Sequence, residues 1–129
     1  MNDQKIAIID YNMGNLASIA NIIKKIGYSC IITSNTEEIL KANKLILPGV
    51  GSFDYGINNL KSLGICDVIF KKILDKRTPV LGICLGMQIL TEGSEEGTEK
   101  GFGFIKGFAK KFSFNDDKLK VPHIGWNTV

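Results

Sequence analysis

Four short apolar runs, separated by segments with helical periodicity, constrain the fold of this chain more than any other feature of its sequence. The runs cover residues 6–9, 28–33, 44–47 and 79–83. Between them, segments 16–26, 52–63 and 65–74 repeat apolar residues at the spacing of one helix face, and a short helix is expected at 36–41. Apolar strands that alternate with helices are typical of a parallel sheet covered on both faces. The sequence therefore predicts an α/β fold with a mainly parallel sheet flanked by helices.

Length and composition exclude several classes of protein. A chain of 129 residues suits one domain, residues 1–129, without room for a second core. Hydrophobic residues make up 44% and charged residues 22%, which excludes an intrinsically disordered chain. The net charge of +3 is too mild and too interspersed for a nucleic-acid binder, and the apolar run 6–9 is too short for a signal peptide or a membrane span. We expect a cytoplasmic protein with neither nucleic acid nor membrane as a partner.

The three cysteines, Cys30, Cys66 and Cys84, are widely spaced and form no C-x-x-C pair. Their odd number and spacing argue against a disulfide framework and against a structural zinc site, and we expect neither a metal nor a cofactor. Cys30 and Cys66 lie within ordinary apolar patterns and are interpreted as packing residues. Cys84 needs a separate explanation.

The pattern changes near the C-terminus. Phe108, Phe112 and Phe114 alternate with more polar residues, and residues 115–117 have the composition of a turn before a second short run that includes Leu119 and Val121. This alternation predicts a β-hairpin appended to the α/β unit. The polar stretch 92–101 is expected to be a surface loop.

The strongest functional signal is Gly82-Ile83-Cys84-Leu85-Gly86, where the last apolar run gives way to a helix expected to end near residue 91. A G-x-C-x-G turn between a strand and a helix lifts a nucleophile above the sheet, and its glycines allow the backbones to approach closely. Cys84 would lie at a helix N-terminus, which favours a thiolate, and the Leu85 amide could receive an oxyanion. A buried packing thiol is the alternative, but the paired glycines favour the nucleophile.

Two further loops follow apolar runs whose carboxyl ends should meet at the same edge of the sheet. Residues 48–53 include Gly49 and Gly51, and such a loop could present an amide beside Cys84, although a plain connection capped by Ser52 explains it as well. Residues 10–16 match a phosphate loop only weakly, and capping of the first helix by Asn12 or Asn15 is an equal alternative.

Residues 121–127 contain the only histidine, His123, and the only tryptophan, Trp126. A single histidine in a cysteine enzyme could be its general base. A histidine beside tryptophan could equally be a surface or interface residue. The residues by themselves leave both interpretations open.

Taken together, these segments resemble the class I glutamine amidotransferases, and among them most closely the glutaminase subunits of imidazole glycerol phosphate synthases. The resemblance rests on five segments in family order. They are Asp10-Tyr-Asn-Met-Gly-Asn-Leu16, Pro48-Gly-Val-Gly-Ser-Phe53, Gly82-Ile-Cys-Leu-Gly-Met-Gln88, Ser94-Glu-Glu-Gly97 and Pro122-His-Ile-Gly-Trp-Asn127. The resemblance implies a flavodoxin-like amidotransferase fold and an enzyme that hydrolyses glutamine to glutamate and ammonia.

The same resemblance implies a role for particular residues. Cys84 matches the nucleophile that forms a glutamyl thioester. The matching oxyanion-hole positions are Leu85, Gly49, Val50 and Gly51, and the matching substrate-binding positions are Gln88 and Glu96. The resemblance also implies a heterodimer with a synthase subunit of (β/α)₈-barrel fold, which receives the ammonia. The positions that match the surface facing this partner are Asn12, Asn15, His123 and Trp126. By this match His123 is not the catalytic base.

The chain also departs from the family pattern. The family's base and orienting acid lie in a His-x-Glu segment beyond the element at 122–127, and the sequence ends at Val129. We therefore expect the fold to be incomplete at its C-terminus, with an uncovered edge or apolar face, and little glutaminase turnover by the chain alone.

Three alternatives remain open at this point. The chain could serve a related barrel protein that amidates a sugar, because the ammonia chemistry would be the same. It could be a hydrolase that uses Cys84 and His123 as a dyad. It could also be a fragment that docks on a barrel without catalysis.

Overall fold

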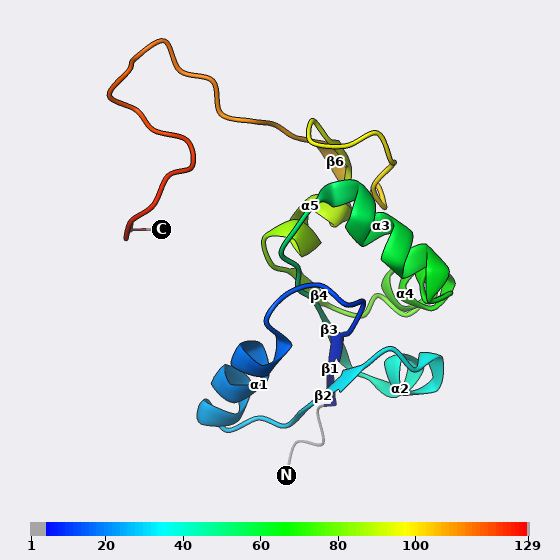
Figure 1. Ribbon diagram of the computed structural model, residues 1–129. Helices are drawn as coiled ribbons and strands as arrows, with labels where there is room; N and C mark the ends of the chain where they lie inside the picture. The colour runs from blue at the N-terminus through cyan, green and yellow to red at the C-terminus, as the bar shows by residue number, and fades with distance from the viewer. Residues whose placement is uncertain (1–4, 129) are drawn as a thin grey trace.

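The computed structural model describes residues 5–128 and contains the predicted alternation of strands and helices (Figure 1). The elements in chain order are β1 (Ile6–Ile9), α1 (Leu16–Lys25), β2 (Cys30–Thr33), α2 (Thr36–Lys41), β3 (Lys44–Leu47), α3 (Phe53–Ser62), α4 (Cys66–Leu74), β4 (Val80–Gly82), α5 (Leu85–Leu90), β5 (Thr91–Ser94) and β6 (Ile105–Ala109). Among the described residues, no helix is long and apolar enough to cross a membrane.

The main sheet has four strands in the order β2-β1-β3-β4, and every neighbouring pair is parallel. Ile8 of β1 lies opposite Ile32 of β2 and Ile46 of β3, and Leu47 lies opposite Gly82 of β4. All carboxyl ends therefore point to one edge of the sheet. The predicted parallel α/β fold is confirmed.

Alternate residues of the two central strands face two separate cores. Ile8 and Ile46 pack with Ala20 and Ile23 of α1 on one face. Their neighbours along β1 and β3 join a larger cluster with residues of α2, α3, α4 and α5 on the other face. Figure 1 shows α1 on one side of the strands and α2 and α4 on the other. Strands buried on both faces explain why the sequence has continuous apolar runs there.

Side chains cap three helices at positions that fit the sequence. The Asn15 side chain accepts a hydrogen bond from the Ser18 N–H at the start of α1, and the Ser52 hydroxyl accepts one from the Tyr55 N–H at the start of α3. Asn35 caps α2 in the same way. The capping interpretations of Asn15 and Ser52 are therefore confirmed, whereas Asn12 adopts a positive φ of 63° in the loop before the cap.

The predicted β-hairpin near the C-terminus is wrong. β6 pairs in parallel with β5, and residues 110–128 form no helix or strand. The stretch 92–101 is accordingly not all loop, since β5 extends to Ser94. The physical reason is a glycine–aromatic pairing: Gly93 of β5 lies opposite Phe108 of β6, and a Cβ on Gly93 would lie 2.7 Å from that ring. Phe112 and Phe114 stack on each other instead of continuing the strand.

Both edge strands of the main sheet carry exposed apolar side chains. Leu81 of β4 is 57% exposed, and Ile31 and Ile32 of β2 are each 40% exposed. The expected uncovered apolar edge is therefore present at β4, next to the turn that carries Cys84.

A buried lysine joins two of the covering helices. The Lys72 ammonium of α4 donates hydrogen bonds to the carbonyls of Leu40 and Ala42, at the C-terminal end of α2. Burial, and to a lesser extent the charge of Lys76, lowers the pKa of Lys72. An ammonium group at this position satisfies carbonyls that the helix leaves unpaired.

Replacing Lys72 by alanine should therefore lower the free energy of unfolding by about 2 kcal/mol, because the carbonyls lose their donor and the buried stem loses its packing. Urea denaturation measures this loss. Lys71→Ala, at an exposed position one residue earlier in α4, should change stability by less than about 0.5 kcal/mol. Equal losses in the two variants would contradict this role of Lys72.

Candidate functional site

The loops that follow β1, β3 and β4 meet at the carboxyl edge of the sheet. The Tyr11 hydroxyl, after β1, donates a hydrogen bond to the Pro48 carbonyl, after β3. The Leu85 N–H, after β4, donates to the Gly49 carbonyl at 3.3 Å. A Cβ on Gly14 would lie only 3.2 Å from the Gly49 nitrogen. The three loops expected from the sequence therefore form one site.

Cys84 occupies a strained turn at this site. It is exposed, has φ 53° and ψ −113°, and directly precedes α5. The left-handed region favours glycine, and a non-glycine residue held there costs on the order of 1–3 kcal/mol. Such strain is found mainly at functional sites. The strand-to-helix elbow expected around Cys84 is confirmed.

The two glycines of the elbow are required by close packing. A Cβ on Gly86 would lie 1.7 Å from the Leu47 carbonyl oxygen, and one on Gly82 would lie 2.7 Å from the Met87 Cα. Real Cβ atoms do not approach backbone atoms so closely. Any larger residue would push α5, and Cys84 with it, away from the end of β3.

The Leu85 amide is occupied in this structure. The sequence suggested that it could receive an oxyanion, but its N–H donates to the carbonyl oxygen of Gly49. Gly49 also lies within the loop expected to supply the second amide, which continues through Val50 to Gly51, where φ is 129°. The expected oxyanion-hole residues are therefore adjacent, but the Leu85 N–H is not free.

Tyr11 is also part of the site, although its role was not predicted from the sequence. Its side chain is fully buried, and burial, with a smaller contribution from the nearby Cys84, raises the pKa of Tyr11 well above its ordinary value. The hydroxyl therefore stays protonated and remains a donor to the Pro48 carbonyl. The Asn59 side chain of α3 holds the Tyr11 carbonyl at 3.0 Å. A tyrosine in an otherwise polar loop was the available signal.

Gln88 and Glu96 are linked to each other through Ser94. The Ser94 hydroxyl donates to the Gln88 side-chain oxygen at 3.4 Å, and the Glu96 N–H donates to the Ser94 hydroxyl oxygen at 3.2 Å. Gln88 lies on α5, one turn beyond Cys84, whereas Glu96 lies in the segment after β5. The structure thus brings the two residues expected to bind substrate into one network.

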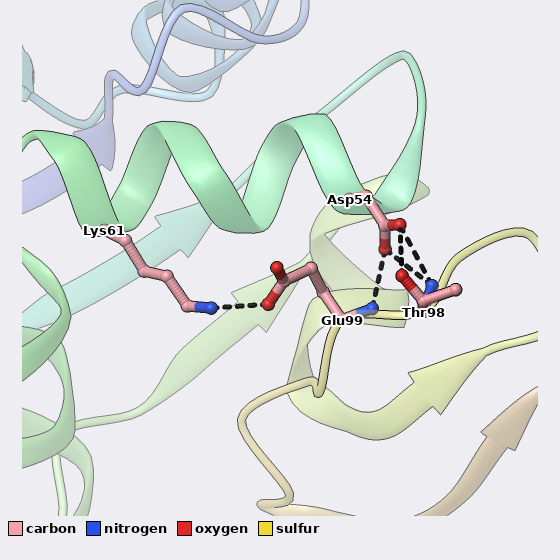
Figure 2. A network of polar contacts seen from close by, with 4 residues as sticks. All are labelled: Asp54, Lys61, Thr98 and Glu99. Atoms are coloured by element: carbon pink, nitrogen blue, oxygen red, sulfur yellow. Dashed lines mark hydrogen bonds and ion pairs between the residues drawn. The ribbon is translucent and has the colours of Figure 1, made fainter.

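Asp54, in the first turn of α3, holds the segment that follows Glu96 (Figure 2). Its carboxylate accepts hydrogen bonds from the N–H and hydroxyl of Thr98 and from the N–H of Glu99, at 2.9 to 3.1 Å. These backbone hydrogen bonds, led by that of Thr98, lower the pKa of Asp54. Lys61, also on α3, forms an ion pair with Glu99. No local sequence pattern indicates this network, because its partners lie far apart in the chain.

The structure does not bring the four expected partner-facing residues together. Asn12 and Asn15 are exposed beside the site. Trp126 is fully exposed, and the hydrogen bond found for His123 joins it to Asn127. In Figure 1 the segment 110–128 runs away from the main sheet and from α5. A Cys84–His123 dyad therefore has no support in this geometry.

The sequence also matches a known protein family. The family model for class-I glutamine amidotransferases matches residues 7–129. The chain belongs to this family. A crystal structure of a glutamine amidotransferase superimposes with a TM-score of 0.68 over 86% of this chain and 59% of that one, at 18% sequence identity, and shows that the amidotransferase fold is shared.

Similar proteins within the family include subunits of imidazole glycerol phosphate synthases from different organisms. The chain is 59% identical over 124 residues to "imidazole glycerol phosphate synthase subunit HisH 2" of Methanococcus maripaludis, and 47% identical over 124 residues to the protein of that name from Pseudomonas aeruginosa. It is 46% identical over 126 residues to subunit HisH of Leptospira interrogans. Each match covers 96% of this chain, which spans about 61–62% of the length of these relatives.

The strain at Cys84 predicts an unusual order of stability among its variants. Cys84→Gly should be more stable than Cys84→Ala by about 1 kcal/mol, because glycine adopts a positive φ without steric conflict. Urea denaturation of the two variants measures the difference.

Cys66, the first residue of α4, provides the control because its backbone is helical. There the alanine variant should be at least as stable as the glycine variant. If alanine were the more stable replacement at residue 84 as well, the turn would not be strained.

Proposed function

We propose that this amidotransferase chain hydrolyses the side-chain amide of glutamine to glutamate and ammonia through a thioester on Cys84. One observation carries the proposal: an exposed thiol is held in a strained turn beyond the carboxyl end of a parallel strand. A nucleophile in this position can approach a planar amide without obstruction from its own strand or helix. The family match over residues 7–129 supports glutamine as the amide donor.

The covalent step proceeds in two halves. The Cys84 thiolate attacks the amide carbon of glutamine, a C–S bond forms, and the carbonyl electron pair moves onto oxygen. As this intermediate collapses, the C–N bond breaks and ammonia leaves once its nitrogen has taken up a proton. Water then hydrolyses the thioester to glutamate and releases the thiol. The family resemblance assigns these proton transfers to a His-x-Glu segment, and residues 1–129 contain no such sequence.

Stabilising the oxyanion requires a change in the loop after β3. The Gly49 carbonyl, which now accepts from the Leu85 N–H, belongs to the peptide that joins Gly49 to Val50. Rotation of this planar peptide turns the carbonyl away and directs the Val50 N–H toward the same region. Two amides, from Leu85 and Val50, then become available to the oxyanion. Glycine on either side of Val50 supplies the backbone freedom that such a rotation needs.

The amino-acid end of glutamine is bound by Glu96, with Gln88 beside it. The Glu96 side chain is exposed, and among residues 5–128 its carboxylate forms no hydrogen bond or ion pair. It is therefore available to the ammonium group of the substrate, and such charge-assisted hydrogen bonds are among the stronger polar contacts. The Ser94 hydroxyl connects this carboxylate's segment to the Gln88 amide.

The names of the relatives support a place for this chain in imidazole glycerol phosphate synthesis. In that role it is a cytoplasmic subunit that pairs with a (β/α)₈-barrel synthase subunit and delivers ammonia to it for histidine biosynthesis. The exposed side chains of Asn12, Asn15, His123 and Trp126 supply the polar and aromatic groups that such interfaces use.

The first half-reaction can be tested with the chloroketone analogue of glutamine, 2-amino-4-oxo-5-chloropentanoate. The thiolate displaces chloride, so a C–S bond forms as the C–Cl bond breaks, and no general base has to act on a leaving amine. Alkylation followed by intact mass and peptide mapping should place one adduct on Cys84, with a rate that saturates in the analogue and falls when glutamine is added.

Cys30 and Cys66 are internal controls, because both are partly buried against the cores. Cys84→Ser should abolish the saturable adduct. Labelling that rises linearly with the analogue and is unaffected by glutamine would overturn the proposed function, because the thiol would then be reactive without a glutamine site.

A further inference from the structure

The segment that carries Glu96 is attached at both of its ends to helices of the site. At one end, Ser94 bonds to the Gln88 side chain of α5. At the other, Thr98 and Glu99 bond to the Asp54 carboxylate of α3. Glu96 lies between these attachments, so its backbone position is set by α5 on one side and by α3 on the other.

The attachment to α3 is closely fitted. Gly97 packs directly against Asp54, and a Cβ on Gly97 would lie 2.2 Å from one carboxylate oxygen and 3.1 Å from the ring of Phe53. The Thr98 N–H lies 2.9 and 3.0 Å from the two carboxylate oxygens, and the Glu99 N–H lies 2.9 Å from one of them. No side chain larger than glycine fits at residue 97 while these hydrogen bonds remain.

Helix formation alone does not explain Asp54. An acidic residue in the first turn is favoured by the helix dipole wherever it occurs, and Asp67 occupies the corresponding first turn of α4. The Asp54 carboxylate, however, bonds to a segment more than forty residues away instead of to its own helix. Figure 2 shows Asp54 and Lys61 along one side of α3, both directed at the segment that contains Thr98 and Glu99.

We propose that Asp54 is a positioning residue that sets the affinity of the site for glutamine by fixing the segment 94–99 and, through it, the carboxylate of Glu96. This role rests on the proposed glutaminase function. Asp54 itself need not touch the substrate. A segment that is already ordered loses less conformational freedom when ligand binds. Removing the hydrogen bonds to Asp54 should therefore weaken glutamine binding more than it slows the chemistry at Cys84.

The experiment compares Asp54→Asn with the unmodified chain. Asparagine keeps the shape of the side chain but removes its negative charge and one of its two acceptor oxygens. The N–H groups of Thr98 and Glu99 and the Thr98 hydroxyl must then share one neutral acceptor, and their charge-assisted hydrogen bonds are lost. The half-saturating concentration of the glutamine chloroketone should rise about tenfold, while the maximal rate of Cys84 alkylation changes less than about twofold. The rate with iodoacetamide, which needs no glutamine site, should also stay unchanged.

Two further variants make the result specific. Gly97→Ala should reproduce the loss of affinity, because its Cβ displaces the segment from Asp54. Asp67→Asn removes an acidic group of the same kind from the first turn of α4 and should leave the half-saturating concentration unchanged. Hydrogen exchange should show faster exchange of the Thr98 and Glu99 amides in Asp54→Asn and not in Asp67→Asn.

The outcomes separate the two proposals. Saturable, glutamine-protected labelling with the same half-saturating concentration in Asp54→Asn would overturn the role of Asp54 and leave the glutaminase proposal standing. Unchanged exchange of the Thr98 and Glu99 amides would overturn that role independently. Labelling of the unmodified chain that does not saturate would overturn the glutaminase proposal, and the positioning role that rests on it would be overturned as well.

Discussion

The close contact between Gly86 and the end of β3 is the constraint on which the site depends. With the Leu47 carbonyl oxygen only 1.7 Å from where a Cβ would be, the first turn of α5 rests directly on the strand backbone. The Ile83 N–H bonds to the same carbonyl at 2.9 Å. The chain must therefore turn sharply between residues 83 and 86, and that turn gives Cys84 its positive φ. The exposure of the thiol is a consequence of this backbone packing.

The same packing determines what surrounds Cys84. Because α5 begins against β3, the Leu85 N–H lies within hydrogen-bond distance of the Gly49 carbonyl. The Tyr11 hydroxyl bonds to the Pro48 carbonyl in the same loop after β3. The loops around Cys84 are thus joined by hydrogen bonds to backbone carbonyls, one from the Leu85 N–H and one from the Tyr11 hydroxyl. The glycines at residues 49 and 51 give the peptide before Val50 the conformational freedom that the proposed rotation needs. The segment expected to bind substrate, in contrast, depends on hydrogen bonds that the side chains of Gln88 and Asp54 accept.

Local patterns were enough to predict the parallel sheet, the order of strands and helices, and the elbow at Cys84. Each of these features follows from apolar periodicity or from glycines next to a strand end. The hairpin prediction failed because Phe108 pairs with Gly93, a glycine that the polar composition of its surroundings assigned to a loop. The roles of Asp54 and Tyr11 were not predicted for a related reason. An aspartate in a first helical turn and a tyrosine in a loop are common in any sequence, and only the folded chain brings their distant partners into contact with them. The hydrogen bond from the Leu85 N–H to the Gly49 carbonyl depends on the orientation of a peptide group, which no residue pattern specifies.

A crystal structure of Cys84→Ala soaked with glutamine tests the proposed chemistry most directly, since the variant can bind the substrate without reacting. We expect the amide carbon of glutamine above residue 84 and its ammonium group at the Glu96 carboxylate. Glutamine bound elsewhere would overturn the proposed function, and so would an empty site at saturating glutamine in a crystal whose packing leaves the site open.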